Sequence, residues 1–228
     1  MHVLAKQLKK PSKDDPEDLS PYEEPYTDQQ LRWLGDALVS WWPQDLPTAD
    51  RLFTLWIAYT GCRRTETSRL DWTAIKSDQV VLPKEITKNN RVHRLPITTQ
   101  MRAILDAAKK LGDSRVFPVT YDGKFVPDSV RSSLARLRVC DPLPDFYKFY
   151  PQHRWRHTMG STLYDEFGYG EHVISQILNH KRKGSITAHY SKKPSSLDTR
   201  AEALQRYGDY LEGVFRSENL ITLLSTSN

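Results

Sequence analysis

The sequence of 228 residues predicts a mainly α fold with a small antiparallel β-sheet (α+β). Along most of the chain, apolar residues recur three or four positions apart, which is the period of amphipathic helices. One stretch, residues 79–97, instead has two short β-rich runs around a cluster of turn-forming residues. The sequence shows no internal repeat, so a single domain of this class is expected to hold most of the chain.

Three segments are expected. Residues 1–26 are charged and broken by prolines, which predicts a linker or a disordered N-terminal segment. Residues 27–215 carry the helical and β patterns and form the predicted domain. Residues 216–228 form a C-terminal tail, whose apolar run LITLL is expected to contact either a neighbouring protomer or its own domain.

The first helix is expected to start after Thr27, because Thr27-Asp28-Gln29-Gln30 has the form of a capping box and leucines follow at helical spacing. A second helix is predicted at 48–59, with Gly61 as its stop. A short helix is expected to carry Glu66 to Leu70. Further helices are predicted at 99–111, 128–139, 154–166, 171–179 and 198–214.

Residues 79–97 predict a β-hairpin. Its strands are the runs QVVLPKEI and RVHRLPI, and Thr87-Lys88-Asn89-Asn90 separates them. These turn-forming residues place Lys88 at or near the tip of the hairpin.

Composition excludes several classes of protein. Hydrophobic residues make up 38% of the chain, and no apolar run approaches the roughly 18–20 residues of a membrane span. The N-terminal residues turn charged before a signal-peptide core could form, so a cytoplasmic protein is expected. Cys62 and Cys140 form no Cys-x-x-Cys pattern, which argues against a disulfide scaffold and a cysteine-based zinc motif.

Charge favours a polyanionic partner. The chain has a formal net charge of +5, and its first 28 residues hold four lysines and seven acids, so the remainder is more basic than the whole. Nucleic acid is the first candidate for such a basic body. The alternative is an ordinary soluble surface, which charge alone does not exclude.

Several local patterns could carry chemistry, and each has an ordinary alternative. Arg63 and Glu66 are three residues apart, which also suits a surface ion pair. Lys88 could be a solvated turn lysine, His180 could interact with a helix dipole, and Tyr190 could serve packing.

His153-x-x-Arg156 places a histidine and an arginine on one face of a helix. His153 and His157 also have the spacing of a zinc-binding helix, but residue 154 is arginine where a metalloprotease has glutamate. No metal is therefore expected there.

Taken in order, these residues resemble the active site of the tyrosine recombinase (phage integrase) family. The resemblance rests on TGCRRTETSRLDW, TKNNRVHRLPI, HRWRHT and ILNHKRKGSITAHY, together with TRAEALQRYGDYL, which resembles integrases of satellite phages and genomic islands. Two residues depart from the family pattern: Arg154 stands where an acid is usual, and Asn179 stands where a glycine is usual.

The resemblance implies a site-specific DNA recombinase that cleaves and rejoins strands through a covalent 3′-phosphotyrosine. Tyr190 would be the nucleophile, Arg63 and Arg156 would hold the phosphate, and Glu66 would orient Arg63. Lys88 would protonate the leaving oxygen, His153 would exchange a proton with Tyr190, and His180 would donate a hydrogen bond to the phosphate. No cofactor, metal or ATP is expected, because the arginines supply the positive charge.

Three alternatives remain. A type IB topoisomerase shares most of these residues but generally has lysine at the position of His153. A non-catalytic DNA-binding relative would be expected to have lost the tyrosine or an arginine. A helix-turn-helix transcription factor would fit the charge but would explain none of the motifs.

The resemblance also implies partners. These are double-stranded DNA, a DNA-dependent homotetramer of the full-length protein, and accessory DNA-bending proteins. Family members carry a further N-terminal DNA-binding domain, so this chain is expected to be an excised catalytic domain, monomeric by itself, that binds DNA weakly. A nucleoid-associated protein of a prokaryote or phage is expected.

Overall fold

The computed structural model describes residues 24–40, 48–121, 124–125, 153–180, 195–215 and 224. These residues are mainly helical and include two small antiparallel sheets, which confirms the predicted fold class. The α-helices are α1 (Asp28–Gly35), α2 (Thr48–Thr60), α3 (Arg64–Ser68), α4 (Thr99–Lys109), α6 (Arg154–Ser161), α7 (Glu171–Ile177) and α8 (Leu197–Phe215). The strands are β1 (Gln79–Leu82), β2 (His93–Pro96), β3 (Thr120–Tyr121) and β4 (Lys124–Phe125). Two π-helical turns, η1 (Asp36–Ser40) and η5 (Thr162–Glu166), continue α1 and α6, and η2 (Trp72–Ala74) is a 3₁₀ turn.

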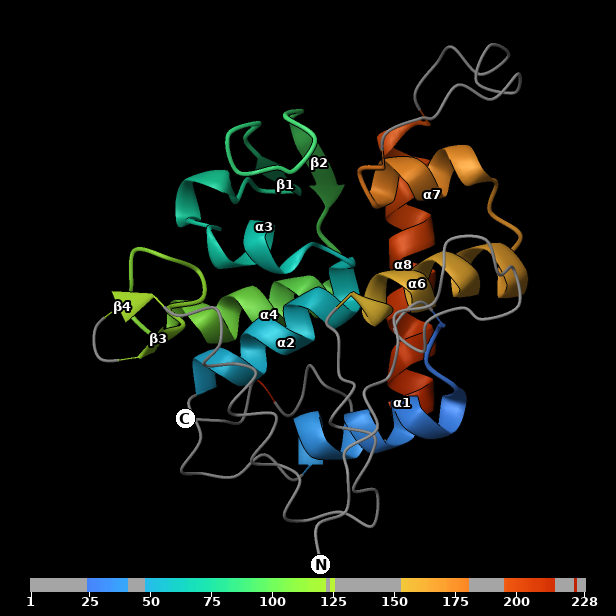
Figure 1. Ribbon diagram of the computed structural model, residues 1–228, viewed down its shortest axis with the longest axis horizontal. Helices are drawn as coiled ribbons and strands as arrows, with labels where there is room; N and C mark the ends of the chain where they lie inside the picture. Colours follow the sequence, from blue (N-terminus) through green and yellow to red (C-terminus); the bar gives the residue numbers. More distant parts are fainter. Residues whose placement is uncertain are drawn as a thin grey trace, which may run out of the picture.

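Helix α2 lies at the centre of the core. Its sequence is apolar on nearly every side, and only Thr48 and Arg51 among its residues are not fully buried. A helix of this kind needs neighbours on all faces, and α2 packs against α3, α4, α6 and α8 (Figure 1). Beside it, Phe117 meets the rings of Trp56 and Phe53 at centroid distances of 5.7 and 6.1 Å.

Helix α1 starts at the predicted capping box. Gln30 N donates to Thr27 Oγ1 at 3.3 Å, and Thr27 N donates to Gln30 Oε1 at 3.1 Å. The helix then packs closely on α8, because a Cβ atom at Gly35 would lie 2.6 Å from the side chain of Phe215. Glycine at position 35 therefore sets the distance between these two helices.

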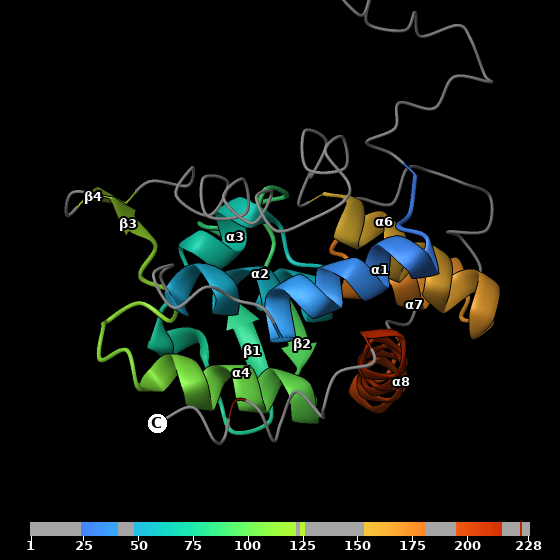
Figure 2. The same cartoon turned by 90° about the horizontal axis from the view of Figure 1, so that it is seen from below.

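Helix α8 crosses the domain and is seen almost end-on in Figure 2. Leu204 and Leu211 of this helix are fully buried, and the helix packs against α1, α2 and β2. Leu224, in the predicted tail, is also buried in the same core. The chain itself thus covers most of the apolar face of α8.

Residues 24–26 pack on α6. Tyr26 is buried, its ring meets that of Trp155 at 4.9 Å, and its backbone N donates to Thr158 Oγ1 at 2.8 Å. Arg154 Nε donates to Glu24 O at 2.9 Å, and its guanidinium covers the ring of Tyr26. The side chain of Arg154 therefore fixes the segment that precedes α1.

The predicted β-hairpin is present, with shorter strands than the sequence indicates. Strand β1 pairs antiparallel with β2 in a register that joins Gln79 to Pro96 and Leu82 to His93. Pro83, which lacks an amide hydrogen, follows β1 directly. Residues 83–92 form the connection, and Lys88 lies in its middle.

Two other expectations need correction. Helix α3 spans Arg64–Ser68 rather than 66–70, because the side chain of Glu66 accepts the backbone N–H of Arg63 and so caps the helix earlier. The β3–β4 pair was not predicted, although Asp-Gly between the strands is a hairpin signal.

The predicted helix 128–139, Cys140 and Tyr190 lie outside the described residues. None of the described helices is long and apolar enough to cross a membrane.

Candidate active site

Five of the six predicted catalytic residues lie in the described part of the chain, at the ends of elements that converge beside the C-terminal end of α2 (Figure 1). They come from the start of α3, the hairpin connection, the first turn of α6 and the residue after α7. In that order they are Arg63, Lys88, His153 with Arg156, and His180. Tyr190 lies outside the described residues.

Arg63 is held by the buried carboxylate of Glu66. Arg63 Nη1 lies 2.9 Å from Glu66 Oε1, and the backbone N of Arg63 donates to Oε2 at 3.2 Å. The ion pair predicted from the i, i+3 spacing is therefore present, but Glu66 is fully buried rather than on the surface. Arg63 Nη2 also donates to Asn179 O at 3.4 Å, so its guanidinium is oriented from two sides.

The carboxylate of Glu66 also contacts the hairpin connection. Lys88 N donates to Glu66 Oε1 at 3.4 Å, while the side chain of Lys88 is exposed. The connection is braced by Thr87 Oγ1, which donates to Arg91 O at 2.7 Å and accepts from Arg91 N at 3.1 Å. Glu66 thus fixes the backbone of Lys88 relative to Arg63, and the side chain of Lys88 extends to the surface.

Arg156 is buried and reaches two backbone carbonyls. Its Nη1 donates to Gly61 O, and its Nη2 donates to Leu178 O at 2.5 Å. Burial, followed by the charge of Arg63, lowers the pKa of Arg156 to about 10, which leaves it a cation at neutral pH. Its Nε has no partner among the described residues.

The end of α7 explains the departure at Asn179. His180 N donates to Ser175 O at 2.8 Å and Asn179 N donates to Gln176 O at 3.3 Å, which is the Schellman pattern. This turn requires a left-handed residue, and Asn179 has φ 47°. Because asparagine adopts this conformation more readily than most residues, it can replace the usual glycine.

The carbonyls of this turn connect the site. Leu178 O accepts from Arg156, and Asn179 O accepts from both Arg63 Nη2 and Asn89 Nδ2. The turn therefore ties both arginines and the hairpin connection to the residue that precedes His180.

The two candidate histidines lie in a positive environment. Desolvation and then the charges of Arg156 and Arg63 lower the pKa of His180 to about 4. Desolvation, Arg156 and His157 are the main causes that lower the pKa of His153, and Arg63 and Lys88 contribute less. Both imidazoles are therefore neutral at pH 7, each with one N–H to donate and one nitrogen to accept.

The comparison with protein families decides the identity of the chain. Residues 27–195 match the model of the phage integrase family. The chain belongs to the phage integrase family. No curated protein and no solved structure matches the chain. Membership of this tyrosine recombinase family supports a recombinase that acts on DNA in recombination and integration.

Some contacts of the site were missed by sequence reasoning. Nothing local in the sequence indicates that Asn89 binds the carbonyl of Asn179, because the two residues are distant in the chain. His93 was also missed, although the sequence holds a signal for its burial. Side chains alternate between the two faces of a strand, so His93 shares the face of the buried Leu95, and Arg94 lies on the exposed face. That alternation places His93 on the inner face of the hairpin.

Proposed function

We propose that this phage integrase family member is a site-specific recombinase that cleaves and rejoins DNA through a 3′-phosphotyrosine at Tyr190. The observation that carries the proposal is the convergence of Arg63, Arg156, Lys88 and the two histidines around the Glu66 carboxylate and the turn after α7. Four separate segments supply these groups, and together the groups could stabilise the charge and transfer the protons of a reaction at one phosphodiester.

The two arginines would hold the phosphate. A phosphodiester gains negative charge on its non-bridging oxygens as a nucleophile attacks, and guanidinium groups stabilise that charge with directed N–H donors. Arg63 and Arg156 are oriented in advance by carbonyl and carboxylate acceptors, so little reorganisation is needed when the phosphate arrives. The arginines would supply the positive charge, and the proposed chemistry needs neither a metal nor ATP.

The remaining groups would move protons. The Tyr190 oxygen attacks phosphorus, the bond from phosphorus to the 5′ oxygen breaks, and Lys88 gives that oxygen a proton. His153, neutral at pH 7, would accept the proton of Tyr190, and His180 would donate its N–H to a phosphate oxygen. Reversal of these steps by a second 5′ hydroxyl rejoins the strand, because the phosphotyrosine bond retains the energy of the cleaved one.

The test of the proposed function is formation of a covalent protein–DNA adduct. Supercoiled plasmid carrying a candidate attachment site is incubated with the protein in EDTA, and the reaction is stopped with denaturing detergent. The expected result is an adduct with the wild type and none with Tyr190→Phe. An adduct that persists in Tyr190→Phe, or that needs Mg²⁺, would contradict the proposal. Relaxation of plasmids that lack the site would instead indicate a topoisomerase.

We also propose the wider organisation of the protein. Residues 27–215 would form the catalytic domain and residues 1–26 a linker whose last residues, 24–26, pack on α6. Residues 216–228 would form a tail that contacts a neighbouring protomer through residues other than Leu224, which is buried in the core of its own domain. The full-length protein would act as a DNA-dependent homotetramer with accessory DNA-bending proteins, in the cytoplasm of a prokaryote. Sedimentation of the protein with and without its DNA site tests the tetramer.

A further inference from the structure

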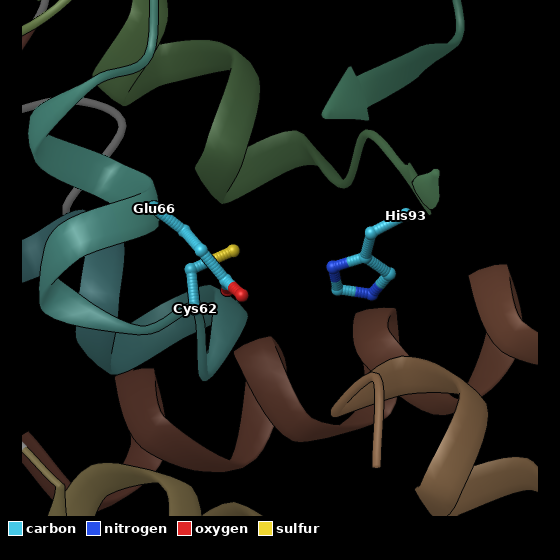
Figure 3. Close-up of side chains that lie close together, drawn as sticks. All are labelled: Cys62, Glu66 and His93. Atoms are coloured by element: carbon cyan, nitrogen blue, oxygen red, sulfur yellow. The ribbon is translucent and has the colours of Figure 1, made fainter. Parts of the chain in front are cut away.

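Three side chains with metal-binding atoms meet in the core beneath the candidate active site. They are Cys62 in the turn after α2, Glu66 in α3 and His93 in β2. One donor atom from each lies within 4.8 Å of the other two, and the three residues are 2%, 0% and 3% exposed, respectively (Figure 3). Two segments, residues 62–66 and strand β2, thus bring a thiol, a carboxylate and an imidazole to one enclosed place.

The imidazole of His93 is already oriented as a ligand. Its Nε2 lies 2.9 Å from Ile177 O, and because a carbonyl can only accept, Nε2 carries the proton. The lone pair is therefore on Nδ1, which has no hydrogen-bond partner among the described residues. Figure 3 shows this nitrogen facing Cys62 and Glu66. Metal-bound histidines have this arrangement, with the second ring nitrogen donating to a carbonyl.

Glu66 can accept one more partner. Its Oε1 accepts from Arg63 Nη1 and Lys88 N, and among the described residues its Oε2 accepts only from the backbone N of Arg63. A carboxylate oxygen has two lone-pair positions, so Oε2 has one to spare. A ligand at that position would not require the Arg63–Glu66 ion pair to break.

We propose that Cys62, Glu66 and His93 form a binding site for Zn²⁺. Sulfur, nitrogen and oxygen donors together suit Zn²⁺ and disfavour Mg²⁺ and Ca²⁺, which prefer oxygen ligands. A thiolate and a carboxylate also bring two negative charges to the ion, of which the Glu66 carboxylate is shared with Arg63. Ligand atoms around tetrahedral zinc are roughly 3.5 Å apart, given metal–ligand distances of about 2.0–2.3 Å. Contraction from 4.8 Å would need side-chain shifts of about an ångström.

Zinc at this site would join the turn that carries Arg63 to the strand that follows Lys88. It would lie among buried side chains, so its role is to fix these segments rather than to touch the phosphate. The proposed zinc site shares Glu66 with the candidate active site, but zinc takes no part in the strand-transfer steps, and the test for zinc needs no DNA.

The experiment measures metal binding by the purified protein after treatment with a chelator. Equilibrium dialysis against Zn²⁺ is expected to give one ion per chain, and Co²⁺ is expected to give a thiolate-to-metal charge-transfer band. The nearly isosteric variants Cys62→Ser and His93→Gln should each weaken binding at least tenfold, and Cys62→Ser should abolish the band. The matched controls Cys140→Ser and His172→Gln should bind like the wild type, since Cys140 is the other cysteine and His172 is exposed.

Two results would overturn the proposal. One is a wild-type protein that binds less than one ion per chain at micromolar free Zn²⁺. This measurement does not depend on whether any variant folds. The other is a Co²⁺ spectrum without a thiolate band, or with a band that Cys62→Ser retains. Zinc binding can fail while the adduct assay succeeds, and the reverse, so the two proposals are tested separately.

Discussion

At the scale of single residues, one buried carboxylate holds the most important groups of the site together. Glu66 contacts the side chain of Arg63, the backbone of Arg63 and the backbone of Lys88. Sequence spacing predicts the first of these contacts. The contact to Lys88 depends on how the hairpin folds back over α3, which local spacing does not reveal.

Glu66→Gln is expected to slow adduct formation by about 10- to 100-fold, which corresponds to the roughly 1.5–3 kcal/mol of a hydrogen bond to a charged group. The amide keeps the shape of the side chain but loses the charge that orients Arg63. The rate is measured by single-turnover adduct formation in EDTA. Glu85→Gln, at an exposed position in the hairpin connection, is the matched control and should react like the wild type. Equal rates for Glu66→Gln and the wild type would refute the positioning role of Glu66.

The buried histidine predicts a pH dependence of stability. Burial lowers the pKa of His93 from its ordinary 6.5 to about 4, so between these values the unfolded chain binds more protons than the folded one. Stability is therefore complete above about pH 6.5 and falls as the pH drops toward 4, by roughly 3 kcal/mol at most from this residue. The pKa of His180 is also lowered to about 4, so this residue too makes the folded protein less stable as the pH falls.

Urea unfolding of the chelator-treated protein at pH 7 and pH 5 checks this dependence. His93→Gln should reduce the difference in free energy of unfolding between the two pH values, whereas His172→Gln should keep the wild-type difference. A stability that rises as the pH falls from 7 to 5 would contradict the assignment.

At the scale of elements, the ends of helices place the functional groups. Glycine is needed at the end of α2, where α6 and α7 pack closely against the chain. Gly61 ends α2 with φ 61°, and its carbonyl accepts from Arg156. A Cβ at this position would lie 2.8 Å from Leu178 Cδ2 and 2.9 Å from Met159 Sδ. Gly61 is therefore required both by its backbone conformation and by the close packing of α6 and α7.

Gly61→Ala is expected to lower the free energy of unfolding by about 2–5 kcal/mol, the sum of left-handed strain and overpacking. Gly112→Ala is the matched control, because Gly112 has φ 68° but, apart from its chain neighbours, no described residue has an atom within 4 Å of the added Cβ. Gly112→Ala should lower the free energy of unfolding only by the left-handed strain, about 1–2 kcal/mol. Chemical denaturation measures both, and equal losses would show that the packing around Gly61 adjusts freely.

The sequence predicts elements better than it predicts the contacts between them. The capping box at Thr27 and Gln30, the stop at Gly61 and the hairpin are local signals, and the structure has all three. The carbonyl of Asn179 joins Arg63 and Asn89 across long stretches of chain, and such contacts follow only from the packed fold. The approach of His93 to Cys62 and Glu66 also depends on the packed fold, so local sequence patterns do not predict it.

At the scale of the whole molecule, exposed cations lie on the hairpin connection that carries Lys88. Lys84, Lys88 and Arg91 are exposed on the hairpin connection, and the chain has a formal net charge of +5. A surface of this kind binds DNA mainly by replacing counterions at phosphates, which makes affinity fall steeply with salt.

DNA affinity is therefore expected to drop at least tenfold between 50 and 200 mM salt, as for a protein that contacts several phosphates. Fluorescence anisotropy with a labelled duplex measures the slope of log affinity against log salt. Lys84→Ala or Arg91→Ala should flatten the slope by about one if the residue contacts a phosphate. An affinity that does not change with salt would contradict binding through this basic surface.

In the proposed mechanism, the groups around Glu66 activate Tyr190 to form a covalent bond with DNA. The most direct measurement is mass spectrometry of the adduct after digestion with nuclease and trypsin. Complete cleavage gives a peptide of residues 184–192, in which Tyr190 is the only tyrosine. The mechanism predicts a nucleotide on this peptide, attached through its 3′ phosphate and formed in EDTA. A nucleotide on any other residue, or a link through a 5′ phosphate, would contradict it.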